Sequence, residues 1–431
     1  MKKFFSLAVI CSLAVPVMAS ADIEKAEVEV TETMEAVETP PTQETTPVEP
    51  RVAPHAPKQE ADHMEKITPR PEGGSEPAHA FLDNLEWQVL ASAFYNFNGY
   101  RVAGPYTVDA DTGDNIDLIG YSVLGAPYTN YMGFGLNFVG GDASYTGEKF
   151  GLTVGLRFGS GAAQLTPLDF VKQAYASWFI GEKLALDFGW FDTIYGAEVA
   201  DEWENANYTR GYLYFLRQPF NHMGVRLGAA LTDEVGFTFM VTNGGVLGGT
   251  PIDDNETPSL GWQFAIAPND DFGLYIGGNH GANGLNGNKD WEHFFDVVLS
   301  IAAADALTIL FNADFQVDGN VSPGPSFLHG YSLAFIVDVT EHFDIGLRGE
   351  ILDGNSDSSA PDYLWTGTLT FRYKPIEYLV LSLEGRVEGS ENDIYFSRNF
   401  TTTTEDGVVS PVPNEKFYGA VIVGATAHFG N

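Results

Sequence analysis

Cysteine is nearly absent from this sequence, and basic residues are few compared with acidic ones. The only cysteine among the 431 residues is Cys11, which lies in a segment predicted to be removed, so neither a disulfide nor thiol chemistry is expected in the mature chain. Lys and Arg number 22 against 58 Asp and Glu, which gives a formal net charge of −36. Because this charge repels phosphate groups, we expect no nucleic-acid partner.

Long hydrophobic runs are also missing. Outside residues 4–18, no stretch approaches the 18 or more apolar residues of a membrane-spanning helix. Residues 1–21 have the features of a secretory signal peptide: Lys2 and Lys3, an apolar stretch, and the small residues Ala19, Ser20 and Ala21. A membrane anchor is the alternative, but an apolar stretch of about 15 residues interrupted by Pro16 is short for one. The sequence therefore predicts export, with Asp22 as the mature start.

Motifs that carry catalysis or bind metals are not found. No glycine-rich phosphate loop follows a strand, and the nine histidines are scattered without zinc-ligand spacing. We therefore predict no catalytic residue, no cofactor and no metal site, and we expect the protein not to be an enzyme.

Residues 22–80 form a segment rich in acidic residues and proline. They include 14 acidic residues, 5 basic residues and 9 prolines, with few large apolar side chains. Such a segment buries too little apolar surface to offset its ordering entropy. We predict a disordered tail, which serves either as a spacer or as a docking segment for a periplasmic partner.

From about residue 85, apolar and polar residues alternate with a period of two. In residues 306–317, Leu307, Ile309 and Phe311 share one face, while Thr308 and Asn312 lie on the other. Most such segments have about the ten residues that a tilted strand needs to cross a bilayer. Sixteen segments follow this pattern: 87–97, 130–140, 149–158, 169–180, 184–193, 221–231, 235–244, 258–267, 271–280, 291–302, 306–317, 327–338, 342–351, 362–373, 377–388 and 415–429.

The connections between these segments alternate between short and long. The short ones include 181–183, 232–234, 268–271, 303–305, 340–342 and 374–377. The long ones are 98–129, 159–168, 194–220, 245–257, 281–290, 318–326, 352–361 and 389–414. This alternation is typical of the periplasmic turns and extracellular loops of outer-membrane barrels.

A soluble β-sandwich also alternates, so further features decide the fold. The strand number is even, and aromatic residues gather at the ends of the apolar faces, where they suit the two membrane interfaces. These aromatic residues are Phe188, Trp190, Trp262, Phe264, Trp291, Phe295, Tyr363 and Trp365. We therefore predict an all-β fold over residues 81–431: a transmembrane antiparallel β-barrel of about 16 strands in the outer membrane of a Gram-negative bacterium.

The polar faces of the predicted strands carry charges, which are costly against lipid and cheap against water. Sixteen strands leave a water-filled lumen, so we expect these residues to line it. The candidates for the lumen wall are Arg157, Asp187, Arg226, Asp314, Asp344, Arg348, Glu350, Glu384 and Arg386.

The third long connection, residues 194–220, has four carboxylates followed by two arginines among aromatic residues. Residues 197–206 have the composition of a short helix, with Val199 and Trp203 one turn apart. Opposite charges across a narrow water path set the ion preference of a pore. The candidates for a pore constriction are Glu198, Asp201, Glu202, Glu204, Arg210 and Arg217. A loop packed on the outer rim is the alternative.

The segment 207–227, NYTRGYLYFLRQPFNHMGVRL, resembles the OmpL-like family of β-barrel porins. The resembling positions are Asn207, Tyr208, Arg210, Tyr212, Phe215, Gln218, Pro219, Phe220, His222, Gly224, Val225 and Arg226. The strand that ends in VTNGG (241–245) is similar as well, although Gly245 stands where that family often has an aromatic residue. The resemblance is strongest over 184–280 and implies a porin-like channel without catalytic residues. Resemblance to sixteen-stranded diffusion porins also implies that the third long loop folds inward and narrows the pore.

We therefore expect a passive channel for small hydrophilic solutes or ions. Residues 81–431 carry 44 acidic and 15 basic residues, which favours cations. The alternatives are a structural or adhesive barrel whose tail or loops bind a partner, and a substrate-specific channel. Outer-membrane lipid is the expected surrounding, and a homo-oligomer remains open because a subunit interface and a lipid-facing surface are equally hydrophobic.

Overall fold

The computed structural model describes a closed antiparallel β-barrel. The described residues are 84–98, 106–108, 115–117, 133–162, 168, 170–249, 252, 257–282, 291–318, 326–354, 363–395, 401–405, 408–412 and 414–431. The predicted signal peptide (1–21) and acidic tail (22–80) lie outside them, and so does the start of the predicted barrel domain.

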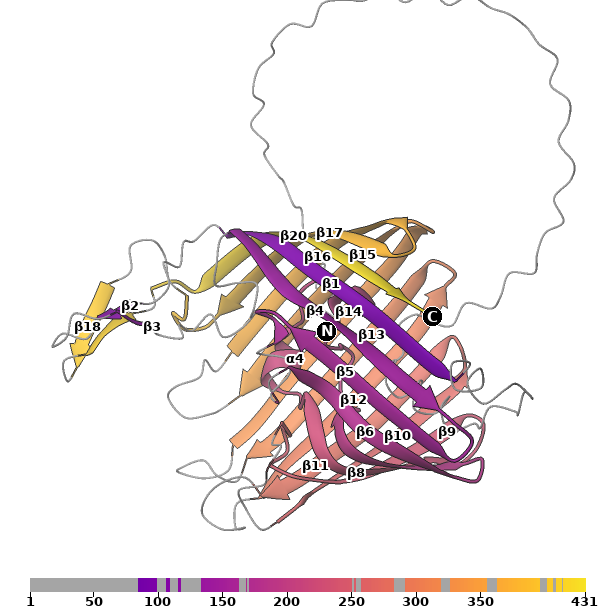
Figure 1. The fold of residues 1–431 in the computed structure, drawn as a ribbon. Coiled ribbons are helices and arrows are strands. Elements are labelled where there is room, and N and C mark those ends of the chain that lie inside the picture. The colour runs from indigo at the N-terminus through magenta and orange to yellow at the C-terminus, as the bar shows by residue number, and fades with distance from the viewer. Residues whose placement is uncertain are drawn as a thin grey trace, which may run out of the picture. The chain divides into compact units, whose positions relative to one another are not determined.

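Sixteen strands form the barrel, as the sequence predicts (Figure 1). Their bounds are β1 (Leu85–Asn98), β4 (Gly133–Thr146), β5 (Phe150–Phe158), β6 (Val171–Ile180), β7 (Leu184–Asp192), β8 (Asn221–Ala230), β9 (Val235–Thr242), β10 (Ser259–Asn269), β11 (Phe272–Ala282), β12 (Trp291–Ala304), β13 (Leu307–Asp318), β14 (Ser326–Thr340), β15 (Phe343–Gly354), β16 (Tyr363–Ile376), β17 (Leu379–Ser390) and β20 (Phe417–Gly430). Each strand pairs with the next, and β20 pairs with β1 through Ala427 and Ala91, which closes the sheet. Closure satisfies the backbone hydrogen bonds that hydrocarbon cannot.

The alternating residues face opposite sides of the wall. On β17, Leu383 and Val387 point outward and are 49% and 51% exposed, whereas Glu384 and Arg386 point inward and are 0% and 1% exposed. An apolar outer face fits lipid, where an arginine or lysine costs about 2–4 kcal/mol at the midplane. The polar side chains are therefore collected in the interior.

The predicted aromatic positions lie on the outer face with one exception. Phe188, Phe264, Trp291, Phe295 and Tyr363 are exposed there, and Trp262 and Trp365 are partly exposed. The prediction for Trp190 is wrong, because this side chain is only 2% exposed. The alternation of β7 ends at Gly189, where φ is 143° and the Cβ of any other residue would overlap the backbone of Ala174.

The connections alternate between short and long as predicted. Four short strands within the long connections were not predicted: β2 (Tyr106–Val108), which pairs with β3 (Asn115–Asp117), and β18 (Thr401–Glu405), which pairs with β19 (Val408–Val412). The described helices in the third long connection are a 3-10 helix, η1 (Glu202–Glu204), and α4 (Tyr212–Leu216). No helix in the described part of the chain is both long and apolar enough to cross a membrane.

Candidate functional site

Residues 193–220, here called the inner loop, cross the interior of the barrel between β7 and β8. The two ends meet where the Thr193 amide donates to the Phe220 carbonyl at 3.0 Å. Between these ends the loop contacts inward-facing side chains of strands that are far apart around the wall, including Asn137 on β4, Asp296 on β12 and Glu384 on β17. The loop therefore extends across the barrel and does not pack on its rim.

Asp201 holds the acidic half of the inner loop against β5 and β6. Its Oδ2 lies 2.7 Å from Arg157 Nη2 and 2.8 Å from Lys172 Nζ, and Arg157 Nε donates to its Oδ1 at 2.9 Å. Burial acts to raise the pKa of Asp201, but the charges of Arg157 and Lys172 outweigh it and hold the pKa well below its usual range. Asp201 is thus an ionised anchor between two wall cations.

Glu202 makes the next contact, toward β4 and β20. Its two carboxylate oxygens accept hydrogen bonds from Asn137 Nδ2 at 2.8 Å and Thr426 Oγ1 at 2.6 Å. Arg210 Nη1 lies 3.8 Å from Glu202 Oε2, and both side chains are fully buried. Burial raises the pKa of Glu202 above its ordinary value, with Arg210 acting in the opposite direction.

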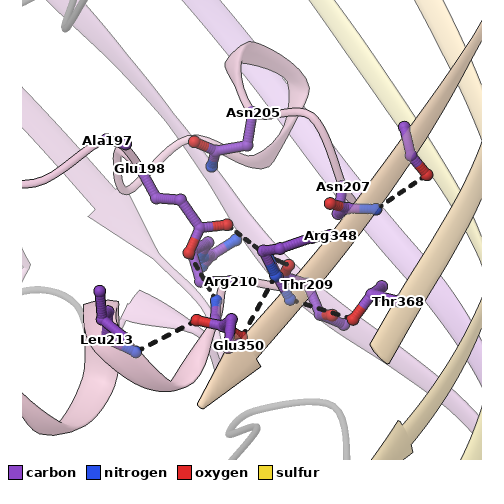
Figure 2. Close-up of polar contacts among 12 residues, drawn as sticks. Ala197, Glu198, Asn205, Asn207, Thr209, Arg210, Leu213, Arg348, Glu350 and Thr368 are labelled. Atoms are coloured by element: carbon purple, nitrogen blue, oxygen red, sulfur yellow. Dashed lines mark hydrogen bonds and ion pairs between the residues drawn. The ribbon is translucent and has the colours of Figure 1, made fainter. Parts of the chain in front are cut away.

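Glu198 pairs with the opposite wall. It forms an ion pair with Arg348 on β15, and its Oε2 accepts a hydrogen bond from the Gly211 amide at 2.6 Å. Arg348 Nε also lies 3.3 Å from Glu350 Oε2. Figure 2 shows Arg348 in contact with both Glu198 and Glu350. Burial raises the pKa of Glu198 above its ordinary value, and the nearby Glu350 carboxylate adds to this effect, whereas Arg348 acts in the opposite direction.

The wall acids bind backbone amides of the inner loop. Glu384 accepts hydrogen bonds from the amides of Tyr208 at 2.7 Å and Thr209 at 3.2 Å. Glu350 accepts from the amides of Tyr212 at 3.0 Å and Leu213 at 3.2 Å, at the start of α4. No side chain of the helix itself caps this end, so a strand residue supplies the missing acceptor.

The wall arginines bind backbone carbonyls of the same loop. Arg348 Nη1 donates to Thr209 O at 2.8 Å, and Arg386 Nη1 donates to Arg210 O at 2.7 Å. Arg372 on β16 donates to Asn205 O and pairs with Asp344. The charged wall and the loop backbone therefore satisfy each other's hydrogen bonds.

All nine predicted wall residues point inward, but their expected contact with water is missing. Their side chains are 0–4% exposed, because the inner loop and neighbouring charges cover them. Asp187, for example, pairs with Arg226 at 2.8 Å, and the Arg226 guanidinium lies over the Phe191 ring at 4.5 Å.

Four of the six predicted constriction residues form ion pairs inside the barrel: Glu198, Asp201, Glu202 and Arg210. Glu204 is partly exposed. Arg217 is also partly exposed, bonds the Leu216 carbonyl through Nη1, and has no ion pair within 4 Å among the described residues. The expected helix over 197–206 is reduced to the three residues of η1.

The sequence interpretation missed several interior residues. Arg372 and Glu388 lie on the inward faces of β16 and β17, inside the predicted segments 362–373 and 377–388, so the same alternation identifies them. Lys172 lies next to a register shift between β5 and β6, where the period of two no longer identifies the inward face. No group of three or more metal-ligating side chains is placed to hold a metal ion among the described residues.

Comparison with sequence families gives one match over most of the chain. Residues 95–412 match the family described as "Putative beta-barrel porin-2, OmpL-like". A comparison with curated proteins found no relative.

Solved structures share this fold at low sequence identity. The outer membrane channel DcaP of Acinetobacter baumannii aligns with a TM-score of 0.52 and 12% identity, over 80% of this chain and 96% of that chain. An anion-selective porin from Comamonas acidovorans aligns with a TM-score of 0.52 and 10% identity, over 80% of this chain and 99% of that chain. The trimer form of Vibrio cholerae OmpT aligns with a TM-score of 0.50 and 14% identity, again over 80% and 99%.

Proposed function

This chain belongs to the OmpL-like family of β-barrel porins, and from that premise we propose that it is a passive channel for small hydrophilic solutes and ions. It is a protein of the Gram-negative outer membrane, where the apolar outer face of the barrel meets lipid. The proposed channel is not an enzyme.

One observation carries the proposal: a charged loop is fixed across the interior of a sixteen-stranded barrel. The inner loop contributes Glu198, Asp201, Glu202 and Arg210, and each has a partner of opposite charge. We infer that this loop is the constriction that limits solute size and ion preference. Glu204 and Arg217, which stay partly exposed, are the constriction residues that solutes meet.

The charge of the interior supports a preference for cations. Among the described residues, seven basic and eleven acidic side chains are buried inside the barrel. An excess of negative charge in a pore concentrates cations and repels anions.

A structural or adhesive barrel is the second candidate, and the covered wall charges favour it. If the inner loop stays in place, its contacts with the wall oppose solute flow, and the long outer loops or residues 22–80 then bind a partner. A substrate-specific channel is a third reading of the same constriction. A trimer, the form described for OmpT of Vibrio cholerae, is proposed here as one assembly for this chain.

Single-channel conductance of the purified barrel, before and after deletion of residues 197–206, tests the proposal. We expect the intact chain to conduct and the deletion to raise conductance severalfold, because it removes the contacts of Glu198, Asp201 and Glu202 with the wall. Unchanged conductance and selectivity would reject the inner loop as the constriction. No conductance from either folded protein would reject the channel and favour the structural barrel.

A further inference from the structure

Two carboxyl groups lie side by side inside the barrel, on β12 and β13. Asp296 and Asp314 are directly opposite each other in the strand register, and both are 0% exposed. The Asn312 side-chain amide bonds both of them, since its Nδ2 donates to Asp296 Oδ1 at 2.8 Å and to Asp314 Oδ1 at 3.0 Å. These three side chains are called the acid–amide clamp.

The acid–amide clamp binds both ends of the inner loop. At the first end, the Gly196 amide donates to Asp296 Oδ2 at 3.3 Å and the Ala197 amide donates to Asn312 Oδ1 at 3.1 Å. At the second end, Gln218 Nε2 donates to Asn312 Oδ1 at 2.7 Å and to Asp314 Oδ2 at 3.1 Å. Three side chains therefore determine where the loop enters and where it leaves the interior.

The two ends are packed against each other at the clamp. Gly196 has a φ of 88°, and a Cβ at this position would lie 2.2 Å from Gln218 Oε1. Only glycine fits both the conformation and the close approach. A change in the clamp side chains therefore alters the packing at both ends of the inner loop.

The clamp differs from the ion-paired acids of the wall because it has no basic partner. Neither carboxyl group has an ion pair within 4 Å among the described residues, whereas Asp187 and Asp344 each pair with an arginine. Arg217 interacts with Asp314 only through space. The next inward acid along β12 is Glu292, two inward positions from Asp296. Two adjacent buried carboxylates repel each other and lose their hydration, so both do not stay ionised together at such a site.

We propose that Asp296, Asn312 and Asp314 position the inner loop by holding one proton between the two carboxyl groups, and that loss of this proton releases both loop ends. The inference rests on the proposed channel function, because release of the constriction changes solute flow. The single proton leaves the clamp with one negative charge and lets one carboxyl group donate to the other. When both groups are ionised, their repulsion separates β12 and β13 side chains from Gly196 and Gln218.

The first experiment measures single-channel conductance of Asn312→Ala, which removes four hydrogen bonds of the clamp. We expect a roughly tenfold rise in the fraction of time spent in the high-conductance state, equivalent to about 1.4 kcal/mol. Gln316→Ala is the matched control, because Gln316 is the next inward residue on β13 and is also buried. Equal behaviour of the two variants would overturn the proposal.

Conductance measured over a series of pH values tests whether a proton shared by Asp296 and Asp314 holds the loop in place. We expect the high-conductance fraction of the unchanged protein to rise from neutral to alkaline pH, as both carboxyl groups ionise. Asp314→Asn keeps the size of the side chain and cannot ionise, so its high-conductance fraction should no longer rise from neutral to alkaline pH, whatever its value at neutral pH. An alkaline rise that persists in Asp314→Asn contradicts the role of the pair.

A second measurement does not depend on conduction. A cysteine replaces Ala200, a buried residue of the inner loop, in a chain whose only cysteine, Cys11, is changed to serine. We expect a small thiol reagent to label this cysteine about tenfold faster in the Asn312→Ala background. Faster labelling without any conductance supports the clamp and rejects the channel, whereas equal labelling with normal conductance supports the channel and rejects the clamp.

Discussion

At the scale of single residues, the interior charges act mainly on one another and on the inner loop. Asp201 shows why: with Arg157 and Lys172 at 2.7 Å and 2.8 Å, its carboxylate serves as the counter-ion of two buried cations. A charge that holds the inner loop in place still adds to the electrostatic field in the lumen. The same side chain can therefore stabilise the packing and contribute to the ion preference. The partly exposed members of the set, Glu204 and Arg217, are the ones whose side chains reach the solvent.

Asp201→Asn should destabilise the folded barrel by about 3–5 kcal/mol, because it leaves Arg157 and Lys172 buried without their shared carboxylate. Denaturant unfolding in detergent measures this. The low folded pKa of Asp201 means that its stabilisation is complete above the ordinary value of 3.8 and falls as the pH drops below it toward the folded pKa. The difference between the two proteins should therefore narrow at pH values below about 3.8. Glu204→Gln, in the same loop, should have a much smaller effect, and an equal effect would contradict this role of Asp201.

Side-chain predictions from the sequence succeeded where the strand period holds. Alternation alone placed Glu384 and Arg386 on the inward face of β17, and both are buried there. It failed at Lys172, beside a register shift, and at Trp190, beyond a glycine with positive φ. Alternation does not identify distant partners, so it could not predict the contacts of Glu384 with Tyr208 and Thr209, which are 176 and 175 residues away in the sequence.

At the scale of secondary-structure elements, strands were easier to predict than the helix of the inner loop. A strand in a barrel is specified by its own two faces, one against lipid and one against the interior. The helix α4 depends on Glu350 of a distant strand to bind its first amides, because the loop provides no capping side chain. This explains why the sequence did not predict α4 at Tyr212–Leu216, although it suggested a helix over 197–206, where the structure has only η1.

Glu350→Ala should therefore loosen α4 without unfolding the barrel. We expect a loss of about 1–2 kcal/mol of local stability, the usual effect of removing a helix cap. Amide hydrogen exchange measures it: Tyr212 and Leu213 should lose protection while amides of β15 keep theirs. Asp353→Ala, at an exposed position near the end of β15, is the control. Unchanged exchange at Tyr212 and Leu213 would show that Glu350 does not cap the helix.

At the scale of the whole molecule, the barrel fold and the charge balance bear on different properties: the fold on the kind of protein, the charge balance on the ion preference. The fold is shared with outer-membrane proteins at 10–14% identity, one of which is named an anion-selective porin, so the fold by itself does not decide the sign of the preferred ion. The proposed cation preference rests instead on the interior charges of this chain, where eleven buried acids outnumber seven buried bases among the described residues. It is therefore argued from the side chains of this sequence and not from the shared fold.

Reversal potentials across a planar bilayer under a salt gradient should show selectivity for cations. The preference should weaken as the salt concentration rises toward 1 M, because the screening length falls from about 10 Å at 0.1 M to about 3 Å. Glu292→Gln removes an interior acid near the long-connection end of β12 and should lower the cation preference, whereas Glu341→Gln, in an exposed turn, should not. A preference for anions in the unchanged protein would contradict the role given to the interior acids. A rearrangement of the interior ion pairs cannot explain such a result, because it does not change the excess of acidic over basic side chains. Selectivity that responds equally to both substitutions would instead place the controlling charge at the exposed surface and leave the inner loop to set only the size limit.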